Sequence, residues 1–131
     1  MNPVVHFEIP YDDRARIMRF YRDVFGWELE HMGEQMGDYV LATTSSKAEP
    51  NPKGKQGAID GGFFPRKADW PAQVPSVVIA VRDIAASMKK VAAAGGEVLG
   101  EPMDIPGVGR YVSFYDTEKN RLSILQPLPM T

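Results

Sequence analysis

The sequence predicts an α+β fold built from two tandem βαβββ modules. Two short runs, VVHFEIP (residues 4–10) with alternating apolar residues and the apolar SVVIAV (residues 76–81), indicate two strands. Each run precedes an amphipathic segment with helical spacing that ends at glycine, and three further strand-like runs follow each helix. The second half of the chain therefore repeats the element order of the first.

The first half predicts one strand, one helix and three short strands. In the first run, apolar residues alternate with His6 and Glu8, which is typical of a half-buried strand. The aspartate pair before residues 14–25 is suited to cap a helix, in which apolar residues recur at helical spacing until Gly26 ends it. Three strand candidates follow, at residues 27–33, 39–44 and 58–65.

The second half repeats this pattern. Asp83 precedes a helical segment, and a glycine pair ends it. A shift of 70 positions superimposes Asp13 on Asp83 and Gly26 on Gly96, and it keeps the apolar residues of both strands and helices in phase. An internal repeat of this length indicates a duplicated module. The strand candidates of the second module are residues 97–102, 110–116 and 121–127.

We expect one domain over residues 1–131. The first module takes about residues 3–65 and the second about residues 76–128, and the proline-containing residues 66–75 connect them. Each module has about 60 residues and a single helix, which is marginal for a core of its own. Residues 43–57 are rich in lysine, proline, glycine and serine and predict a loop between strands.

The composition argues against several classes of protein. Fifteen basic and seventeen acidic residues give a net charge of −2 without a basic cluster, so nucleic acid is not an expected partner. The chain has no cysteine, which excludes disulfides, thiolate metal sites and cysteine nucleophiles. No apolar run approaches the roughly 20 residues of a membrane span and no signal peptide is recognisable, so we expect a cytoplasmic protein without membrane contact.

Three motifs carry a resemblance to a known family. The chain opens with an H-x-x-x-P strand followed by F-Y-x-x-x-F-G-W, its first half closes on GGFFPR, and its second half ends with VGRYVSFYDTEKNRLSILQP. With these motifs the sequence resembles the vicinal oxygen chelate superfamily of glyoxalases, bleomycin-resistance proteins and extradiol dioxygenases. The resemblance implies curved, mostly antiparallel sheets with the helices outside, a ligand cleft between the two modules, and a homodimer.

The same resemblance bears on a metal site, because each module of the metal-dependent members supplies two ligands. The matching positions hold His6, Ser76 and Ser123, and Asp60 is the carboxylate nearest the fourth position. A catalytic zinc, nickel or iron site needs about three nitrogen or carboxylate ligands, and serine hydroxyls are poor ligands for these ions. We therefore expect no metal cofactor. The alternative is a divalent ion (Zn, Ni, Mn or Fe) held by His6, Glu8 and Asp60.

Side-chain alternation selects candidates for contact with an organic ligand. In RYVSFYD the apolar pair is expected to pack against the helix, which leaves Tyr111 and Tyr115 on the opposite face. Arg121 is suited to bind an anionic group, although a surface arginine paired with an acid is the more common arrangement. Tyr39 is a further aromatic candidate for lining a cavity. The predicted ligand-binding set is His6, Glu8, Phe64, Ser76, Tyr111, Tyr115, Arg121 and Ser123.

Three function classes stay open, and the sequence does not decide whether the protein is an enzyme. The leading class is a small-molecule-binding protein of the glyoxalase/bleomycin-resistance type with an incomplete metal site and a ligand in the cleft. Such a protein sequesters a compound or performs metal-free chemistry, for which His6 and Glu8 are the candidate acid–base pair. The second class is a metal-dependent lyase, isomerase or dioxygenase that uses His6 with Glu8 and Asp60. The third is an accessory interaction module with no ligand.

Overall fold

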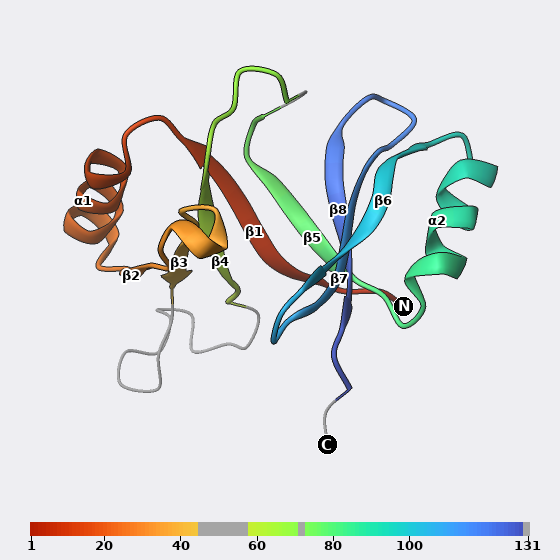
Figure 1. Ribbon diagram of the computed structural model, residues 1–131, viewed down its shortest axis with the longest axis horizontal. Helices are drawn as coiled ribbons and strands as arrows, with labels where there is room; N and C mark the ends of the chain where they lie inside the picture. Colours follow the sequence, from red (N-terminus) through yellow and green to blue (C-terminus); the bar gives the residue numbers. More distant parts are fainter. Residues whose placement is uncertain (45–57, 71–72, 130–131) are drawn as a thin grey trace. The chain divides into compact units, whose positions relative to one another are not determined.

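The computed structural model describes residues 1–44, 58–70 and 73–129 (Figure 1). Its helices are α1 (Arg14–Phe25), α2 (Ile84–Ala93) and a short 3₁₀ helix, η1 (Glu34–Met36). Its strands are β1 (Val4–Tyr11), β2 (Glu28–His31), β3 (Val40–Thr43), β4 (Asp60–Pro65), β5 (Ser76–Ala80), β6 (Glu97–Ile105), β7 (Gly109–Tyr115) and β8 (Arg121–Pro127). In this part of the chain no helix has the length and apolar character needed to cross a membrane. All but the first two residues of the predicted loop 43–57 lie outside the described residues, as do residues 71–72 of the predicted connector.

The chain divides into two compact units. We call His6–Pro75 the N-terminal unit, and Met1–Val5 with Ser76–Thr131 the C-terminal unit. Strand β1 begins in the C-terminal unit, where the Ala80 N–H donates to the Pro3 carbonyl oxygen at 2.9 Å, and it continues into the N-terminal unit. The assignment of both modules to one domain stays a prediction.

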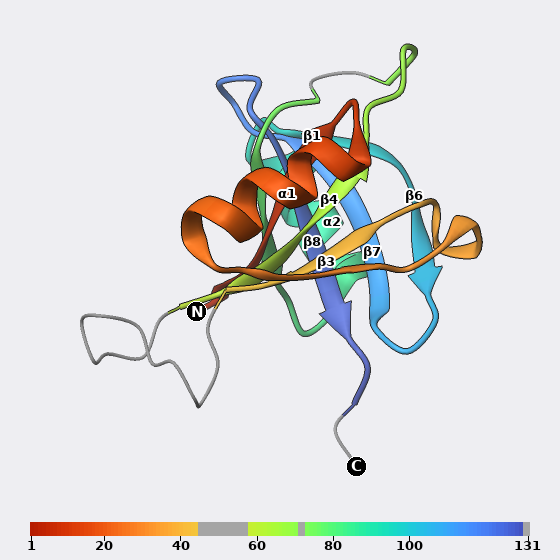
Figure 2. The same cartoon turned by 90° about the vertical axis from the view of Figure 1, so that its left-hand side faces the viewer.

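In the N-terminal unit, α1 covers one face of four strands in the order β2-β3-β4-β1 (Figure 2). The β1–β4 pair is parallel, and the β2–β3 and β3–β4 pairs are antiparallel. Because side chains alternate along a strand, every second residue points toward the helix. The buried core on this side consists of Tyr11, Val40, Ala42 and Phe63, with Phe7, Ile9, Ile17, Met18, Tyr21, Trp27 and Leu29 packed against it.

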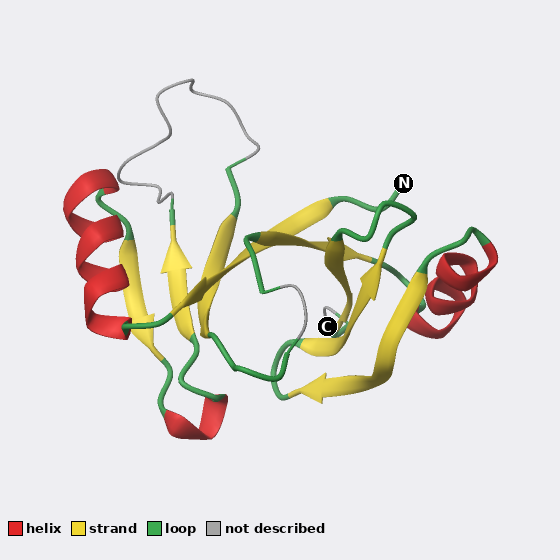
Figure 3. Cartoon of the chain, turned by 90° about the horizontal axis from the view of Figure 1, so that it is seen from above, coloured by secondary structure: helices red, strands yellow, loops and turns green. Residues whose placement is uncertain are grey.

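The C-terminal unit has the corresponding strand order, β5-β8-β7-β6, again with one parallel pair, β5–β8, and otherwise antiparallel pairs. Figure 3 shows the helix of each unit on one side of its own strands. Equivalent strands of the two halves thus hold equivalent places, which confirms the α+β class and the two βαβββ modules. The core on the α2 side consists of Val81, Ile84, Val112, Phe114 and Ile124.

The ends of the helices follow the signals in the sequence. The Oδ1 atoms of Asp13 and Asp83 each accept a hydrogen bond at 3.0 Å, from the N–H groups of Arg16 and Ala86 respectively. This satisfies an N–H group that has no partner within the helix. Gly26 ends α1 with a φ of 72°, in the left-handed region that glycine adopts without a steric penalty.

Strand β6 is longer than its sequence indicates. It was expected to end at residue 102 but runs to Ile105. The pairing of β6 with β7 shifts register between Leu99 and Met103 and then resumes as far as the Ile105–Gly109 pair. The turn before β7 therefore begins after Ile105 and not directly after residue 102.

Two consecutive glycines in β4 make room for aromatic rings. A methyl group built on Gly61 would overlap the ring of Phe7, and one built on Gly62 would overlap the ring of Tyr39. The register between β1 and β4 is uninterrupted at these positions, so the glycines mark a close approach of rings and not a bulge. The two rings lie on opposite faces because Gly61 and Gly62 are adjacent in the strand.

We expect Gly61→Ala to lower the free energy of unfolding by about 1–3 kcal/mol, because the added methyl group overfills the core around Phe7. Urea denaturation of the wild type and the variant measures this change. In a Phe7→Leu background the same substitution should cost less, since the smaller side chain leaves space. An equal cost in both backgrounds would contradict the proposed overlap with Phe7.

Candidate functional site

The face of each unit's strands that points away from its helix, here called the helix-free face, carries the predicted ligand-binding residues. In the N-terminal unit, Phe7 and Ile9 pack on the α1 side, so His6 and Glu8 lie on the helix-free face. The parallel register pairs His6 with Asp60 and Pro10 with Phe64. It therefore places both β4 residues on the same face as His6 and Glu8.

His6 contacts a tyrosine that the sequence did not assign to it. Its Nε2 atom lies 2.8 Å from the Tyr39 hydroxyl oxygen, and the planes of the two rings are 17° apart with their centroids separated by 6.4 Å. This contact depends on Gly62, because any side chain there would occupy the place of the Tyr39 ring. The predicted acid–base partner of His6 was Glu8, whereas the hydrogen bond that the structure shows is to Tyr39.

The charge state of His6 is set by two opposing effects. Burial lowers the pKa of His6 below its usual value, and the nearby Asp60 carboxylate raises it by a smaller amount. The imidazole is consequently neutral at pH 7, with one ring nitrogen that donates and one that accepts. A neutral imidazole beside a tyrosine hydroxyl has both a donor and an acceptor for a bound molecule or for a proton.

In the C-terminal unit, all five predicted residues occupy one face. Val112, Phe114 and Ile124 pack on the α2 side, and the β7–β8 register pairs Ser113 with Ser123 on the other face. The alternation predicted from RYVSFYD is confirmed. The predicted residues that share this helix-free face are Ser76, Tyr111, Tyr115, Arg121 and Ser123.

A line of hydrogen bonds joins side chains across this face. The Arg121 Nη2 atom donates to the Ser113 hydroxyl at 3.1 Å, the two serine Oγ atoms lie 2.9 Å apart, and Ser123 donates to the Tyr111 hydroxyl at 2.6 Å. Since the single proton of Ser123 is used toward Tyr111, Ser113 must be the donor between the two serines. Ser113 was absent from the predicted set, although it has the same parity as the two tyrosines of β7.

The serine pair is well shielded from solvent. Ser113 is 7% exposed and Ser123 is 2% exposed. A buried hydroxyl without a partner costs about 1–3 kcal/mol, so the hydrogen bonds to Arg121 and Tyr111 are needed for these serines to be tolerated there. The line from Arg121 to Tyr111 is therefore a polar element built into the strands, and we call it the hydroxyl line.

The donor set of the two faces does not fit the metal site that the family implies. No group of three or more histidine, cysteine or acidic side chains with metal-binding geometry occurs within residues 1–44, 58–70 and 73–129. The serines at two of the expected ligand positions are engaged otherwise, since Ser76 donates to the Arg121 carbonyl oxygen at 2.7 Å and Ser123 belongs to the hydroxyl line. Asp60 accepts a hydrogen bond at 2.8 Å from the backbone N–H of Thr44.

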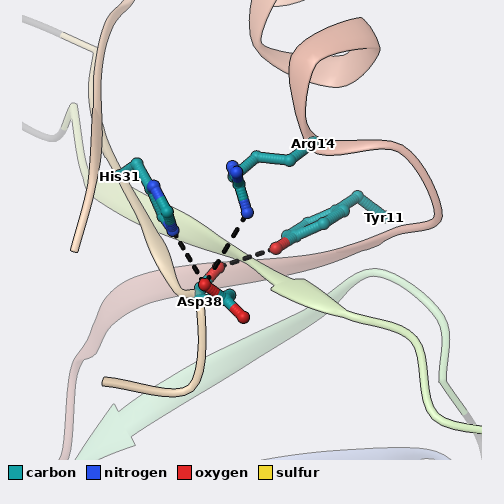
Figure 4. A network of polar contacts seen from close by, with 4 residues as sticks. All are labelled: Tyr11, Arg14, His31 and Asp38. Atoms are coloured by element: carbon teal, nitrogen blue, oxygen red, sulfur yellow. Dashed lines mark hydrogen bonds and ion pairs between the residues drawn. The ribbon is translucent and has the colours of Figure 1, made fainter. Parts of the chain in front are cut away.

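A second polar cluster lies on the α1 side of the N-terminal unit and was not predicted (Figure 4). The Asp38 carboxylate lies 2.9 Å from His31 Nε2 and 3.7 Å from Arg14 Nη1, and the Asp38 carbonyl oxygen accepts a hydrogen bond at 2.7 Å from the Tyr11 hydroxyl. Asp38 has a φ of 56°, a conformation that aspartate tolerates better than most residues. The cluster ties the turn before β3 to the start of α1, so the second histidine has a structural contact.

Comparison with known proteins gives one family. A family model described as Glyoxalase/Bleomycin resistance protein/Dioxygenase superfamily matches residues 4–124. "Putative glyoxylase CFP32" of Mycobacterium tuberculosis (strain CDC 1551 / Oshkosh) is 47% identical over 53 residues, which is 40% of this chain and 20% of that protein. The protein of the same name from Mycobacterium bovis matches to the same extent. The matched stretch thus spans about a fifth of these curated relatives.

Solved structures share the fold. Methylmalonyl-CoA epimerase from Mycobacterium tuberculosis aligns with a TM-score of 0.68 at 15% identity, over 96% of this chain and 88% of that one. A variant of the Streptomyces coelicolor methylmalonyl-CoA epimerase in complex with 2-nitronate-propionyl-CoA gives a TM-score of 0.71 at 16% identity, over 99% and 97%. A superfamily member from Vibrio splendidus 12B01 gives 0.60 at 16% identity, over 96% and 99%. At such identities the likeness establishes the fold alone.

The effects on His6 predict its titration. We expect its imidazole to titrate below the ordinary histidine range, and Asp60→Asn to lower its pKa further, because the substitution removes the opposing negative charge. Two-dimensional NMR of the histidine side chains measures the pKa of His6 in the wild type and in Asp60→Asn. Asp38→Asn, which alters the partner of His31, is the matched control and should leave the pKa of His6 unchanged.

The same shift determines how stability depends on pH. The folded-state pKa of His6 lies below its unfolded value, so the unfolded chain binds more protons between the two values. This contribution to stability is therefore complete above the unfolded pKa and is lost as the pH falls toward the folded pKa. His6→Gln should flatten the dependence of the free energy of unfolding on pH in this range.

For the titration experiment, a raised or unchanged pKa of His6 in Asp60→Asn would contradict the assignment of Asp60 as its electrostatic neighbour.

Proposed function

The chain belongs to the Glyoxalase/Bleomycin resistance protein/Dioxygenase superfamily, and we propose that it binds a small organic molecule on the helix-free faces of its strands. The observation that carries the proposal is the hydroxyl line from Arg121 to Tyr111. Small-molecule sites combine apolar surface with a few polar groups that are held in place beforehand. Two buried serines that orient a guanidinium and a tyrosine hydroxyl meet that description.

The helix-free face of the N-terminal unit supports the same proposal. There the neutral His6 and the Tyr39 hydroxyl are fixed against each other above Gly62, and Phe64 adds an aromatic side chain on the same face. These groups offer hydrogen bonds and apolar surface without a formal charge. Binding, sequestration and metal-free acid–base chemistry all require such groups. The homodimer, which rests on the family, and the cytoplasmic location, which rests on the composition of the sequence, belong to this proposal.

The proposal is tested by screening a small-molecule library with thermal shift and saturation-transfer NMR. We expect ligands whose affinity falls about tenfold in His6→Gln, which removes the imidazole, or in Ser123→Ala, which removes the hydrogen bond that orients the Tyr111 hydroxyl. His31→Gln and Arg110→Gln are matched controls, because these side chains bond to Asp38 and Asp104 away from the helix-free faces. They should leave the affinity unchanged.

The pattern of effects also tells which faces a ligand uses. Sensitivity to His6→Gln assigns a ligand to the helix-free face of the N-terminal unit, and sensitivity to Ser123→Ala assigns it to that of the C-terminal unit. A screen without ligands would favour the accessory interaction module instead. Ligands that are insensitive to both substitutions would place the binding site elsewhere on the protein.

One observation speaks for the metal-dependent alternative and sets its test. His6 and Asp60 are direct register partners, and the charge of Asp60 acts on the imidazole. With only hydroxyls at the other expected positions, we predict that the purified, untagged protein takes up no stoichiometric zinc, nickel, manganese or iron(II). Elemental analysis after incubation with each ion measures this. One equivalent of metal that His6→Ala removes would overturn the prediction and restore His6, Glu8 and Asp60 as ligands.

A further inference from the structure

We propose that Arg121 forms an anion-binding position on the helix-free face of the C-terminal unit, which takes the carboxylate or phosphate group of an organic ligand. The inference deepens the proposed function and rests on it, because it assigns a charge and a binding group to the molecule that the helix-free faces hold. The shared chemistry of the two candidate groups is a planar or tetrahedral oxyanion that accepts two parallel N–H bonds.

Arg121 differs from other arginines of the structure in its surroundings. The guanidinium of Arg110, one strand away, pairs with Asp104 at 3.0 Å, and its side chain is 57% exposed. The guanidinium of Arg66 pairs with Asp12 at 2.6 Å. Arg121 is half-buried, yet within the described part of the chain it forms no ion pair. Partial burial of a guanidinium without a counter-ion lowers the stability of the fold. Stability therefore does not explain why Arg121 stands at this position, whereas a binding role does.

The guanidinium retains donors for a ligand. It has five N–H groups, and the side-chain hydrogen bond that it forms within the described residues runs from Nη2 to the Ser113 hydroxyl. Among the described residues no buried side-chain nitrogen or oxygen atom lacks a partner. The guanidinium nitrogens other than Nη2 are therefore within reach of solvent. One N–H group of Nη2 remains beside its bond to Ser113, and with the adjacent N–H of Nε or Nη1 it forms the fork that matches an oxyanion.

The hydroxyl line holds this fork in one orientation. Ser113 accepts a hydrogen bond from Arg121 and donates its O–H to Ser123, which in turn donates to Tyr111, so the hydrogen-bond dipoles run in one direction away from the guanidinium. Neutral hydroxyls position the guanidinium without cancelling its charge, whereas a carboxylate would do both. This difference distinguishes a prepared anion site from an ordinary structural ion pair.

The neighbours of Arg121 fit the organic part of such a ligand. Tyr115 is its direct partner in the β7–β8 register and lies half-buried on the same face. Glu97 is the register partner of Tyr115 on β6, and it forms no ion pair with Arg121. An aromatic ring beside an unpaired guanidinium provides apolar contact next to the charge. A cationic ligand would find no such complement at Arg121.

The test uses acetate, inorganic phosphate and acetamide as probes on the intact protein, at constant ionic strength set with chloride. Acetamide is the neutral counterpart of acetate. The readout is the Nε–H cross-peak of each arginine in ¹H–¹⁵N spectra, with Arg121 assigned from the peak that Arg121→Lys removes. We expect saturable shifts of the Arg121 peak with acetate and phosphate, none with acetamide, and a dissociation constant at Arg110 at least about tenfold weaker.

Two variants separate an anion site from a structural cross-link. Arg121→Lys keeps the charge but loses the fork, and Ser113→Ala keeps the fork but loses its support. Acetate binding to the two variants is followed by the backbone amide peaks of Ser113 and Tyr115, because Arg121→Lys has no Nε–H peak at this position. Both substitutions should weaken acetate binding severalfold, while Arg110→Lys should leave binding at Arg121 unchanged. Acetate affinity that is unchanged in Arg121→Lys, equal shifts at Arg110 and Arg121, or shifts with acetamide would each overturn the proposal.

The library screen of the proposed function distinguishes the two failures. Ligands that bind equally well as neutral analogues would overturn the anion position and leave the binding function intact. Saturable acetate binding at Arg121 without any organic ligand would support the anion position and count against the wider function. Acetate and phosphate are compared directly, so the preferred oxyanion follows from the ratio of their dissociation constants.

Discussion

The rest of the structure depends on the alternation of side chains along the strands. In each unit the burial of one strand face under a helix fixes which residues point to which side. Phe63 and Val112 are almost fully buried on the helix sides, and this burial determines the register of β4 and β7. A slip of one residue would exchange the two faces of a strand and bury its polar set. Every polar group considered as a binding residue is therefore placed by the apolar residues next to it.

The helix-free faces of the two units satisfy their buried hydrogen-bonding groups in two different ways. In the C-terminal unit, Ser113 and Ser123 satisfy each other and extend to Arg121 and Tyr111 at the two ends. In the N-terminal unit, His6 loses its tendency to carry charge through burial and bonds with Tyr39 as a neutral ring. Each solution keeps buried polar atoms paired, which a folded protein with only a small margin of stability requires.

Shared fold and shared chemistry are separate matters in this protein. The chain belongs to a superfamily named for glyoxalases, bleomycin-resistance proteins and dioxygenases, and one scaffold of this kind hosts unrelated activities. Here Ser76 donates to the Arg121 carbonyl oxygen and Ser123 to the Tyr111 hydroxyl, so two positions that the resemblance assigns to metal ligands hold neutral hydroxyls engaged in hydrogen bonds.

The sequence by itself determined the duplicated βαβββ order, the helix caps at Asp13 and Asp83, and the strand faces of Tyr111 and Ser123, because these depend on local periodicity and on backbone groups a few residues away. Only the tertiary structure decided that His6 meets Tyr39, that Arg121 bonds to Ser113, and that Asp38 joins Tyr11 to His31. Such contacts join residues on different elements, and their geometry follows from strand register and from the space that residues such as Gly62 leave open. No local pattern in a single chain specifies that space.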